Sequence, residues 1–331
     1  MKKLFSSYEA FVLLAIVILS AIITSMNPNF LTLENFLDLL KSYSFVGILA
    51  IGVLIVLVSG GIDISFTATA TIAMYVMAVV VNQYGGNMFI AFLIASVIGI
   101  ILGMFNAIIV HFFKIHSIIA TIATLNIYYG LLTVFSGGKW IYSLPTWFRE
   151  FAQVRVFTLT NSTGGQYGLS IITVIWFAFL GLVWVLLRYT IIGRGVYALG
   201  GNSVSAERVG FNILRLQLFV YGFMGWIAGI AGVVLTLLVQ SVAPNSIVGK
   251  ELDVLAAVIL GGASLMGGVG TLSGTILGVI LIATMNNGMT LMRIPAFWYD
   301  VFIGLIIVIS VSTSAYQNKK KQSKTIAIEV E

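Results

Sequence analysis

Apolar runs of about twenty residues follow one another along almost the whole chain, and they fix what it can fold into. A run of this length is what an α-helix needs to cross the hydrocarbon core of a bilayer. Of the 331 residues, 60% are hydrophobic and only 8% are charged, whereas a soluble domain carries about a quarter of charged residues. So few charged residues cannot cover a water-exposed surface. The chain must therefore fold within a lipid bilayer. The runs lie at 9–26, 43–59, 64–82, 88–110, 117–136, 168–187, 216–239, 253–266, 271–290 and 298–315.

A backbone in lipid must satisfy its own hydrogen bonds, and no alternating ten-residue pattern of a barrel is present, so these runs predict helices. We predict an all-α fold, a polytopic transmembrane helix bundle of about ten membrane segments. Segments 43–59 and 253–266 are short and run into glycine clusters, so we expect some segments to be short or broken at Gly-rich stretches. Two such breaks after similar apolar runs indicate a weak internal repeat. Residues 1–315 form one transmembrane domain, followed by a basic cytoplasmic tail at 316–331.

The positions of the basic residues predict the orientation of the bundle, because cytoplasmic loops are enriched in Lys and Arg. With ten crossings and both termini in the cytoplasm, eleven of the 17 basic residues fall inside and six fall outside. The inner set is Lys2, Lys3, Lys114, Arg188, Arg194, Arg208, Arg215, Lys319, Lys320, Lys321 and Lys324, and the outer set is Lys41, Lys139, Arg149, Arg155, Lys250 and Arg293.

Small residues recur at every fourth position in three segments, which places them on one face of each helix. Such faces let two helix backbones approach closely in a membrane, so we interpret them as packing surfaces. The positions are Ala95, Gly99, Gly103 and Ala107, then Gly225 and Gly229, then Gly270, Gly274 and Gly278.

Residues that support catalysis or metal binding are few. The chain has no cysteine, which excludes disulfides and thiolate metal sites. Its two histidines, His111 and His116, have no carboxylate pair nearby, so we expect no metal site. Phosphate-loop, HExxH and GxSxG motifs are absent, which disfavours a membrane enzyme and indicates that no cofactor binds this chain. The net charge of +6 fits positive cytoplasmic loops, and we expect lipid rather than nucleic acid as its surroundings.

The two glycine-rich breaks carry the main helix-ending residues. In VSGGIDIS, Gly60 and Gly61 precede Asp63, and the second break contains Gly261 and Gly262. An intramembrane carboxylate is a functional candidate. At a helix start, however, Asp63 can also cap unpaired N–H groups, and this capping role is the one we favour.

Neutral polar side chains are scattered inside the predicted spans. Hydroxyls and amides suit a neutral polyhydroxylated solute, whereas ion-coupled transport usually relies on charged groups near the midplane. Each of these side chains can equally form a hydrogen bond that joins two helices. The candidates for a translocation pathway are Asn106, Thr121, Thr124, Asn126, Tyr128, Asn286 and Asn287.

The interior polar stretch 188–215 is the most charged segment between two spans, and the charge count places it in the cytoplasm. Ser203 or Ser205 can cap a short helix through Glu207 and Arg208, which Gly210 can end. A solvated positive loop and a protein contact both explain this composition. The residues that would take part in such a contact are Arg194, Ser203, Ser205, Glu207, Arg208, Gly210 and Asn212.

A long outer loop, 137–167, places tryptophans among charged residues. Tryptophan favours the membrane interface, so an amphipathic segment on the outer surface is one interpretation. A docking surface for an external partner is the other. The docking candidates, which include two residues from the loop before 253–266, are Trp140, Trp147, Arg149, Lys250 and Glu251.

Several motifs taken together resemble one family. They are SGGIDIS at 59–65, NAIIVHFFKIHSIIATIATLNIYYGL at 106–131, GRGVYALGGN at 193–202, GKELDVLAAVILGGASLMGGVGTLSGTILG at 249–278 and NNG at 286–288. In this order they resemble the permease subunit of carbohydrate-type ATP-binding cassette importers, the ribose/xylose/galactose branch. SGGKWIYSLP and RIPAFWYD look most like the permeases for rhamnose and autoinducer-2. Phe66-Thr67-Ala68 departs from the small VGS-type turn of many relatives, which puts a carried-over role for that turn in doubt.

The resemblance implies a multi-pass permease in the bacterial cytoplasmic (inner) membrane that makes no covalent change itself. It implies a cytoplasmic ATPase that binds ATP and Mg, a second permease copy or a homologous permease, and an external solute-binding protein. It also implies that 203–212 is a coupling helix seated in the ATPase. The expected cargo is a small neutral sugar or sugar-like solute. A nucleoside permease of the same kind and an ion-coupled secondary transporter are the alternatives.

Overall fold

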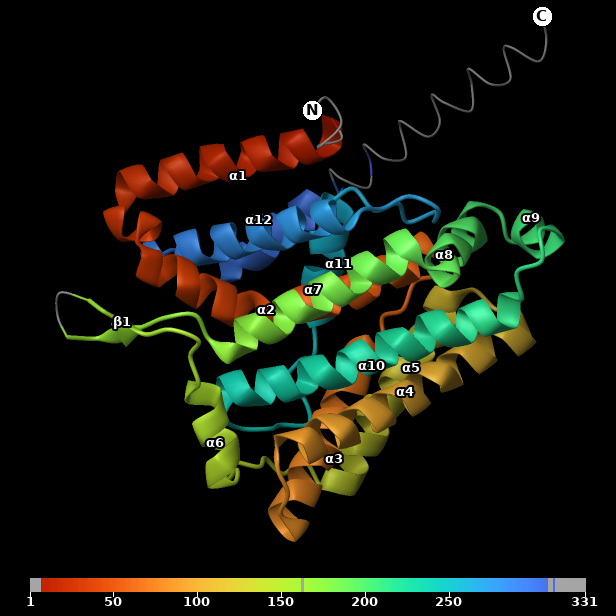
Figure 1. The fold of residues 1–331 in the computed structure, drawn as a ribbon, viewed down its shortest axis with the longest axis horizontal. Coiled ribbons are helices and arrows are strands. Elements are labelled where there is room, and N and C mark those ends of the chain that lie inside the picture. The colour runs from red at the N-terminus through yellow and green to blue at the C-terminus, as the bar shows by residue number, and fades with distance from the viewer. Residues whose placement is uncertain (1–6, 162–163, 309–311, 313–331) are drawn as a thin grey trace, which may run out of the picture.

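The computed structural model describes residues 7–161, 164–308 and 312, and it is an all-helical bundle with one small β hairpin (Figure 1). The tail at 316–331, predicted to be a basic cytoplasmic segment, lies outside the described residues. The elements are α1 (Ser7–Met26), a 3-10 turn (Pro28–Leu31), α2 (Leu33–Val58), α3 (Phe66–Tyr84), α4 (Met88–Phe113), α5 (Ser117–Ser136), α6 (Thr146–Gln153), β1 (Leu159–Thr160), β2 (Gln166–Tyr167), α7 (Ile171–Tyr189), α8 (Ile191–Gly201), α9 (Ser203–Arg208), α10 (Ile213–Val239), α11 (Lys250–Leu260), α12 (Leu272–Leu291) and a shorter apolar helix, Phe297–Val308.

Eight of the described helices are long and apolar enough to cross a membrane: α1, α2, α3, α4, α5, α7, α10 and α12. The two remaining predicted segments are shorter helices, α11 and Phe297–Val308. The prediction that 253–266 is short and ends at glycine is confirmed, because α11 stops at Leu260 before Gly261.

The prediction that 43–59 is a short segment is wrong. Helix α2 has 26 residues and begins ten positions earlier, at Leu33. Its first turn contains Glu34 and Asn35, and the Thr32 hydroxyl caps it by accepting a hydrogen bond from the Asn35 N–H at 3.2 Å. A cap of this kind starts a helix in front of its apolar part, so hydrophobicity alone set the boundary too late.

Helices α2 and α10 form the centre of the bundle. Their most apolar windows are 83% and 78% buried, whereas those of α1, α4, α5 and α7 are between 17% and 28% buried. A helix that is apolar all round and buried belongs to a core, and one that leaves an apolar surface in a membrane faces lipid or another protein. The outer helices therefore wrap a two-helix core.

The close packing predicted for the small residues is confirmed between α4 and α10. A Cβ atom added at Gly99 would lie 2.0 Å from the Gly225 carbonyl oxygen, and one added at Gly229 would lie 2.2 Å from that of Ala95. Gly274 and Gly278 likewise meet the backbone of α11. Larger side chains would push these helix pairs apart.

The two ends of the bundle differ in structure. Figure 1 shows α8 and α9 projecting at one end, with the start of α1 facing that side, and α6 with the β hairpin at the opposite end. At the α6 end, Ile141 and Val242 exchange two backbone hydrogen bonds of 2.9 Å, which ties the long 137–167 loop to the segment after α10.

Candidate functional site

The first helix break runs from Ser59 to Ser65, between α2 and α3. Helix α2 ends in a glycine turn in which Gly60 has a φ of +81°. The Gly60 and Gly61 N–H groups donate to the last carbonyls of α2, those of Leu57 and Val56, at 2.9 and 3.1 Å. This left-handed cap is favoured at glycine because a side chain would be strained there. Gly60 and Gly61 thus end the helix, as predicted.

Side chains of α5 satisfy the backbone of this break. The Ile62 N–H donates to Ser117 Oγ at 2.9 Å, and the Ile64 N–H donates to Thr121 Oγ1 at 3.2 Å. The Thr121 hydroxyl in turn donates to the Ile62 carbonyl at 3.2 Å. Non-helical backbone at membrane depth is tolerated only where protein groups satisfy it. Ser117 and Thr121 therefore hold the break in place.

Asp63 is buried within the break, with 3% of its surface exposed. Its Oδ1 accepts hydrogen bonds from the Ser65 N–H and hydroxyl at 2.8 and 2.7 Å, immediately before α3 begins. The Asn106 amide of α4 then donates to Ser65 Oγ at 2.6 Å. Burial raises the pKa of Asp63 to about 6, while the Ser65 hydrogen bonds lower it. The carboxylate accepts an N–H at the helix start, as expected, although Ser65 is the capping residue itself.

Four of the predicted pathway residues lie together beside this break: Asn106, Thr121, Thr124 and Tyr128. Tyr128 donates to the Leu102 carbonyl at 3.1 Å and lies 3.5 Å from Asn106 Oδ1. All four side chains are buried, and each has a partner within the bundle. The hydrogen bonds give this set a structural role, and its role in translocation stays a prediction.

The other three predicted pathway residues lie elsewhere. Asn126 is exposed on α5 and donates to the Ile122 carbonyl of its own helix. Asn287 exchanges two amide hydrogen bonds of 2.9 and 3.0 Å with Asn35, which joins α12 to α2. Asn286 lines a small cavity that contains none of the residues of the first break. The seven candidates therefore do not form one continuous surface in a single chain.

The second break separates α11 from α12 and repeats the turn of the first. Gly262 has a φ of +90°, and the Gly262 and Ala263 N–H groups donate to the Ile259 and Val258 carbonyls at 2.9 and 3.2 Å. Gly261 and Gly262 therefore end α11 as predicted. The following loop closes on itself, because the Ser264 N–H donates to the Val269 carbonyl at 2.9 Å.

Glycines from three segments meet between the two breaks. The Gly268 N–H donates to the Val58 carbonyl at 2.9 Å. A Cβ atom added at Gly200, near the end of α8, would lie 1.9 Å from that same carbonyl oxygen, and one added at Gly267 would lie 2.6 Å from Gly60 Cα. We call Gly60, Gly200, Gly267 and Gly268 the glycine junction. It brings both helix breaks into backbone contact with the α8–α9 segment.

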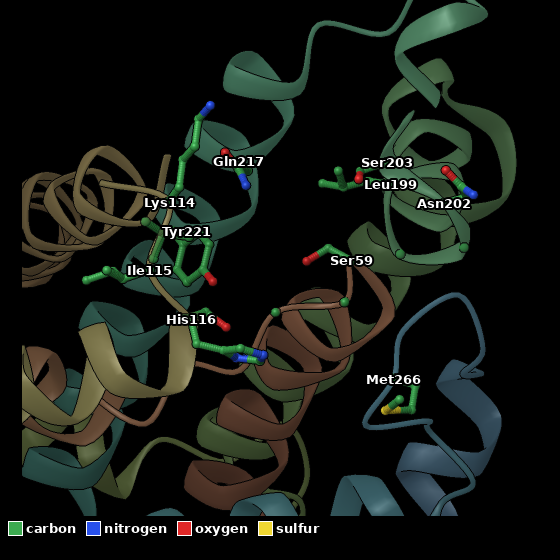
Figure 2. Close-up of a pocket in the computed structure, with 16 residues that line it drawn as sticks. Ser59, Lys114, Ile115, His116, Leu199, Asn202, Ser203, Gln217, Tyr221 and Met266 are labelled. Atoms are coloured by element: carbon green, nitrogen blue, oxygen red, sulfur yellow. The ribbon is translucent and has the colours of Figure 1, made fainter. Parts of the chain in front are cut away.

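An open polar cavity of about 480 Å³ lies beside the glycine junction. Figure 2 shows Lys114, Ile115 and His116 from the α4–α5 turn on one side, and Leu199, Asn202 and Ser203 on the other. The further residues that line it are Ser59, Gly60, Gly61, Val110, Ser117, Gly200, Gly201, Gln217, Tyr221 and Met266. Within the described residues no group of three His, Asp or Glu side chains is arranged to hold a metal.

The α8–α9 segment is more helical than the sequence indicated, since α8 takes up eleven residues of the predicted loop 188–215. The expected cap at Ser203 or Ser205 is wrong: Asn202 Oδ1 accepts from the Ser205 N–H at 2.9 Å and caps α9. Asn202 precedes the helix with the extended backbone typical of an N-cap residue, with φ −163° and ψ 108°, whereas Ser203 and Ser205 lie within the helix.

Gly210 follows α9 with a φ of +96°, and Asn212 caps α10 by accepting from the Arg215 N–H at 2.9 Å. The short helix and its glycine end are therefore confirmed. Of the α9 residues only Ala206 is buried, while Glu207 and Arg208 are exposed. Arg194, on α8, is exposed as well. Val204 and Val209 are 56% and 74% exposed as well. Exposed apolar and charged residues on one projecting helix form a surface suited to a protein contact.

At the opposite end, the predicted docking residues divide into exposed and buried ones. Trp140 and Arg149 are exposed, and Trp147 is half-buried on α6. The Lys250 side chain is 49% exposed. Glu251 is buried, with 6% of its surface exposed, and accepts a hydrogen bond from the Thr67 hydroxyl. The prediction that Glu251 belongs to an outer docking surface is therefore wrong, because helix α11 turns this residue into the bundle.

Some of the residues that hold the site were missed by sequence reasoning. Ser117 satisfies the first break together with Thr121, and it lies one helical turn before Thr121, so the i, i+4 spacing could have revealed it. The Thr67–Glu251 contact joins residues 184 positions apart, and no local pattern indicates such a pair.

Comparisons with known proteins agree with this architecture. Residues 35–311 match the family described as branched-chain amino acid transport system / permease component. The chain is 32% identical over 310 residues to the ribose import permease protein RbsC of Haemophilus influenzae, covering 93% of each chain. It is 31% identical over 311 residues to the autoinducer 2 import system permease protein LsrC of Salmonella choleraesuis, covering 93% of this chain and 86% of that one.

A third relative, the LsrC protein of Yersinia pestis (strain Pestoides F), is 31% identical over 308 residues, covering 93% of this chain and 85% of the relative. No solved structure matches the chain. The matched region contains both helix breaks, the glycine junction and the α8–α9 segment. With eight apolar helices of spanning length and a family match over most of its residues, the chain is a multi-pass membrane protein that belongs to the branched-chain amino acid transport system / permease component family.

Proposed function

We propose that this chain is the transmembrane permease subunit of an ATP-driven importer that carries a neutral sugar or sugar-like solute across the bacterial inner membrane. The observation that supports this most strongly is the similarity to ribose and autoinducer 2 import permeases over 93% of the chain. The polar side chains inside the bundle are mostly hydroxyls and amides, which suit a neutral solute with many hydroxyl groups.

The projecting α9 end is the proposed contact for a cytoplasmic ATPase, which would bind the ATP and Mg itself. Glu207 and Arg208 are exposed there beside Val209, and Asn202 and Gly210 fix the ends of the short helix. Arginine gives rigid, multi-donor contacts at a protein interface. The glycine junction then links this contact to both helix breaks.

The opposite end would receive an external solute-binding protein. Trp140 and Arg149 are exposed on this end, and Lys250 is half-exposed near it. The apolar outer faces of α4 and α5 leave room for a second permease copy or a homologous permease. In this proposal the solute path runs from an outer docking surface to the inner α9 end.

Uptake into proteoliposomes tests the proposal. The permease is reconstituted with its ATPase and with a binding protein loaded with D-ribose or with autoinducer 2. We expect uptake that requires both the ATPase and ATP. Uptake that continues without the ATPase, driven by an ion gradient, would show instead a secondary transporter.

A double substitution tests the contact at α9. Glu207→Ala with Arg208→Ala removes two exposed side chains without touching the buried core, so the permease should fold normally. We expect the amount of co-purified ATPase and the uptake to fall at least tenfold. Arg188→Ala, at the same end but outside α9, is the control and should keep both. Unchanged values in the double variant would place the ATPase contact elsewhere.

A further inference from the structure

A second, smaller cavity of about 240 Å³ lies away from the glycine junction, between α2, α11, α12 and the helix Phe297–Val308. Its polar side chains come from four helices and from the loop before α11, and they converge on one space. They are Ser42, Tyr43, Ser246, Lys250, Asp253, Asn286 and Tyr299. Volumes of drug-binding pockets begin near 300 Å³, so this cavity suits a ligand of one small ring.

The charges in the cavity cancel one another. Lys250 Nζ donates to Asp253 Oδ2 at 2.8 Å, and the Asp253 side chain is only 10% exposed. The Lys250 ammonium also lies 5.7 Å from the centre of the Tyr299 ring. A carboxylate that already has a cationic partner gives no net attraction to a further ion. The cavity therefore favours a neutral polar ligand over a metal or an anion.

The remaining groups can recognise hydroxyl groups and the faces of a sugar ring. The Tyr43 and Tyr299 side chains interact with each other and lie beside Asp253. Asn286 adds an amide with two donors and one acceptor oxygen. Aromatic rings with a carboxylate and an amide combine an apolar platform with donors and acceptors, which is what a polyhydroxylated ring requires.

The cavity lies near the end of the bundle opposite α9. Ser246 at its rim is exposed and belongs to the loop between α10 and α11. That loop contains Val242, which is bonded to Ile141 of the long 137–167 loop. A solute released by a protein docked on these loops would meet the cavity before it reached the helix breaks.

We propose that this cavity is an entry subsite for the neutral sugar-like solute, with Asp253, Asn286 and Tyr299 as its binding residues and Lys250 as the partner that keeps it neutral. The subsite rests on the proposed function. It gives Asn286 a role that its neighbour Asn287, which is paired with Asn35, does not share.

The chain has no cysteine, so a single introduced thiol can test the subsite. Ser246→Cys is labelled from outside with a bulky, membrane-impermeant maleimide, and ATP-driven uptake of D-ribose or autoinducer 2 from the loaded binding protein is then measured. We expect labelling to lower the uptake at least tenfold, because the adduct fills the cavity. Asn245→Cys, an exposed neighbour that does not line the cavity, should be labelled equally and keep its uptake.

A second variant probes binding rather than blockage. Asn286→Ala should lower the uptake rate at saturating loaded binding protein about fivefold while leaving the amount of co-purified ATPase unchanged. Uptake by labelled Ser246→Cys at the level of labelled Asn245→Cys, or unchanged uptake by Asn286→Ala, would overturn the subsite alone. If the unmodified chain shows no ATPase-dependent uptake, the proposed function fails together with the subsite.

Discussion

The two helix breaks end their preceding helices with the same turn. Gly60 and Gly262 have φ angles of +81° and +90°, and the residues before them, Ser59 and Gly261, have nearly equal backbone angles. The Gly60 and Gly61 N–H groups donate to carbonyls of α2. The Gly262 and Ala263 N–H groups donate to the carbonyls at the corresponding positions of α11. One capping geometry is therefore used at both breaks, and the weak internal repeat stays a prediction.

What surrounds each turn is different. The first break is bound by side chains of α4 and α5, including Asn106, Ser117 and Thr121. The second break closes through its own backbone and through one backbone hydrogen bond to α2, from the Gly268 N–H to the Val58 carbonyl, and Met266 and Val269 in its loop are 79% and 61% exposed. We infer that the first break is a fixed point of the bundle and that the second opens at a lower free energy.

The largest effect should follow from removing a side chain that holds the first break. Thr121→Val keeps the shape but leaves the Ile62 carbonyl and the Ile64 N–H without their partner. Unpaired buried backbone groups cost about 1–3 kcal/mol each, so we expect a loss of several degrees in Tm in thermal melting of the purified protein. Thr121→Ser keeps the hydroxyl and should melt close to wild type. Equal melting of both variants would mean that the hydroxyl does not hold the break.

The shared turn should respond equally at both breaks. Gly60→Ala and Gly262→Ala each force a side chain into the left-handed region, which costs roughly 1–2 kcal/mol. We expect similar decreases in Tm for the two variants. Gly130→Ala, where an added Cβ meets no atom within 4 Å inside α5, is the control and should not lower Tm. A large effect at one break only would show that the two turns are not equivalent.

The buried carboxyl should make stability depend on pH through the first break only. Because burial raises the pKa of Asp63 from 3.8 to about 6, the folded state binds the proton more tightly than the unfolded state. This tighter proton binding contributes fully to the free energy of unfolding below pH 3.8, and the contribution is lost as the pH rises through about 6. Asp63→Asn removes this dependence. If the Tm values of the unmodified protein and of Asp63→Asn change equally with pH between about 4 and 8, the pH dependence belongs to another group.

The smallest effect should come from the second break. Ser264 Oγ accepts only the Met266 N–H, at 3.1 Å, in an exposed turn. Water can replace this hydrogen bond, so Ser264→Ala should change the free energy of unfolding by less than about 0.5 kcal/mol. A decrease as large as that of Thr121→Val would remove the difference between the two breaks.

The sequence predicted the parts of the molecule that follow local rules. Hydrophobic runs located eight spanning helices, and glycine doublets located both breaks, because a left-handed turn requires glycine or strain. The fourfold small residues correctly predicted faces of close packing, and α4 and α10 pack through two of these faces. The short helix α9 followed from its capping residues, with an error of one position in the cap.

The remaining features depend on which helices meet, which local patterns do not encode. Asn106, Thr121 and Tyr128 are predicted pathway residues, and the structure shows that Asn106 and Thr121 also bond to a break 40 or more residues away, while Tyr128 bonds to α4. Glu251 belongs to the predicted docking residues, yet α11 carries it inward to Thr67. The glycine junction joins three segments that are far apart in the chain, so it becomes visible only in three dimensions.

The glycine junction is tested most directly by the number of solute molecules taken up per ATP hydrolysed in proteoliposomes. A Cβ atom at Gly200 meets the Val58 carbonyl at 1.9 Å, whereas one at the adjacent Gly201 meets no atom within 4 Å. If the junction links α9 to both helix breaks, Gly200→Ala lowers this ratio at least fivefold while its ATPase still co-purifies, and Gly201→Ala keeps the wild-type ratio. Equal ratios for the two variants would contradict a link through the glycine junction.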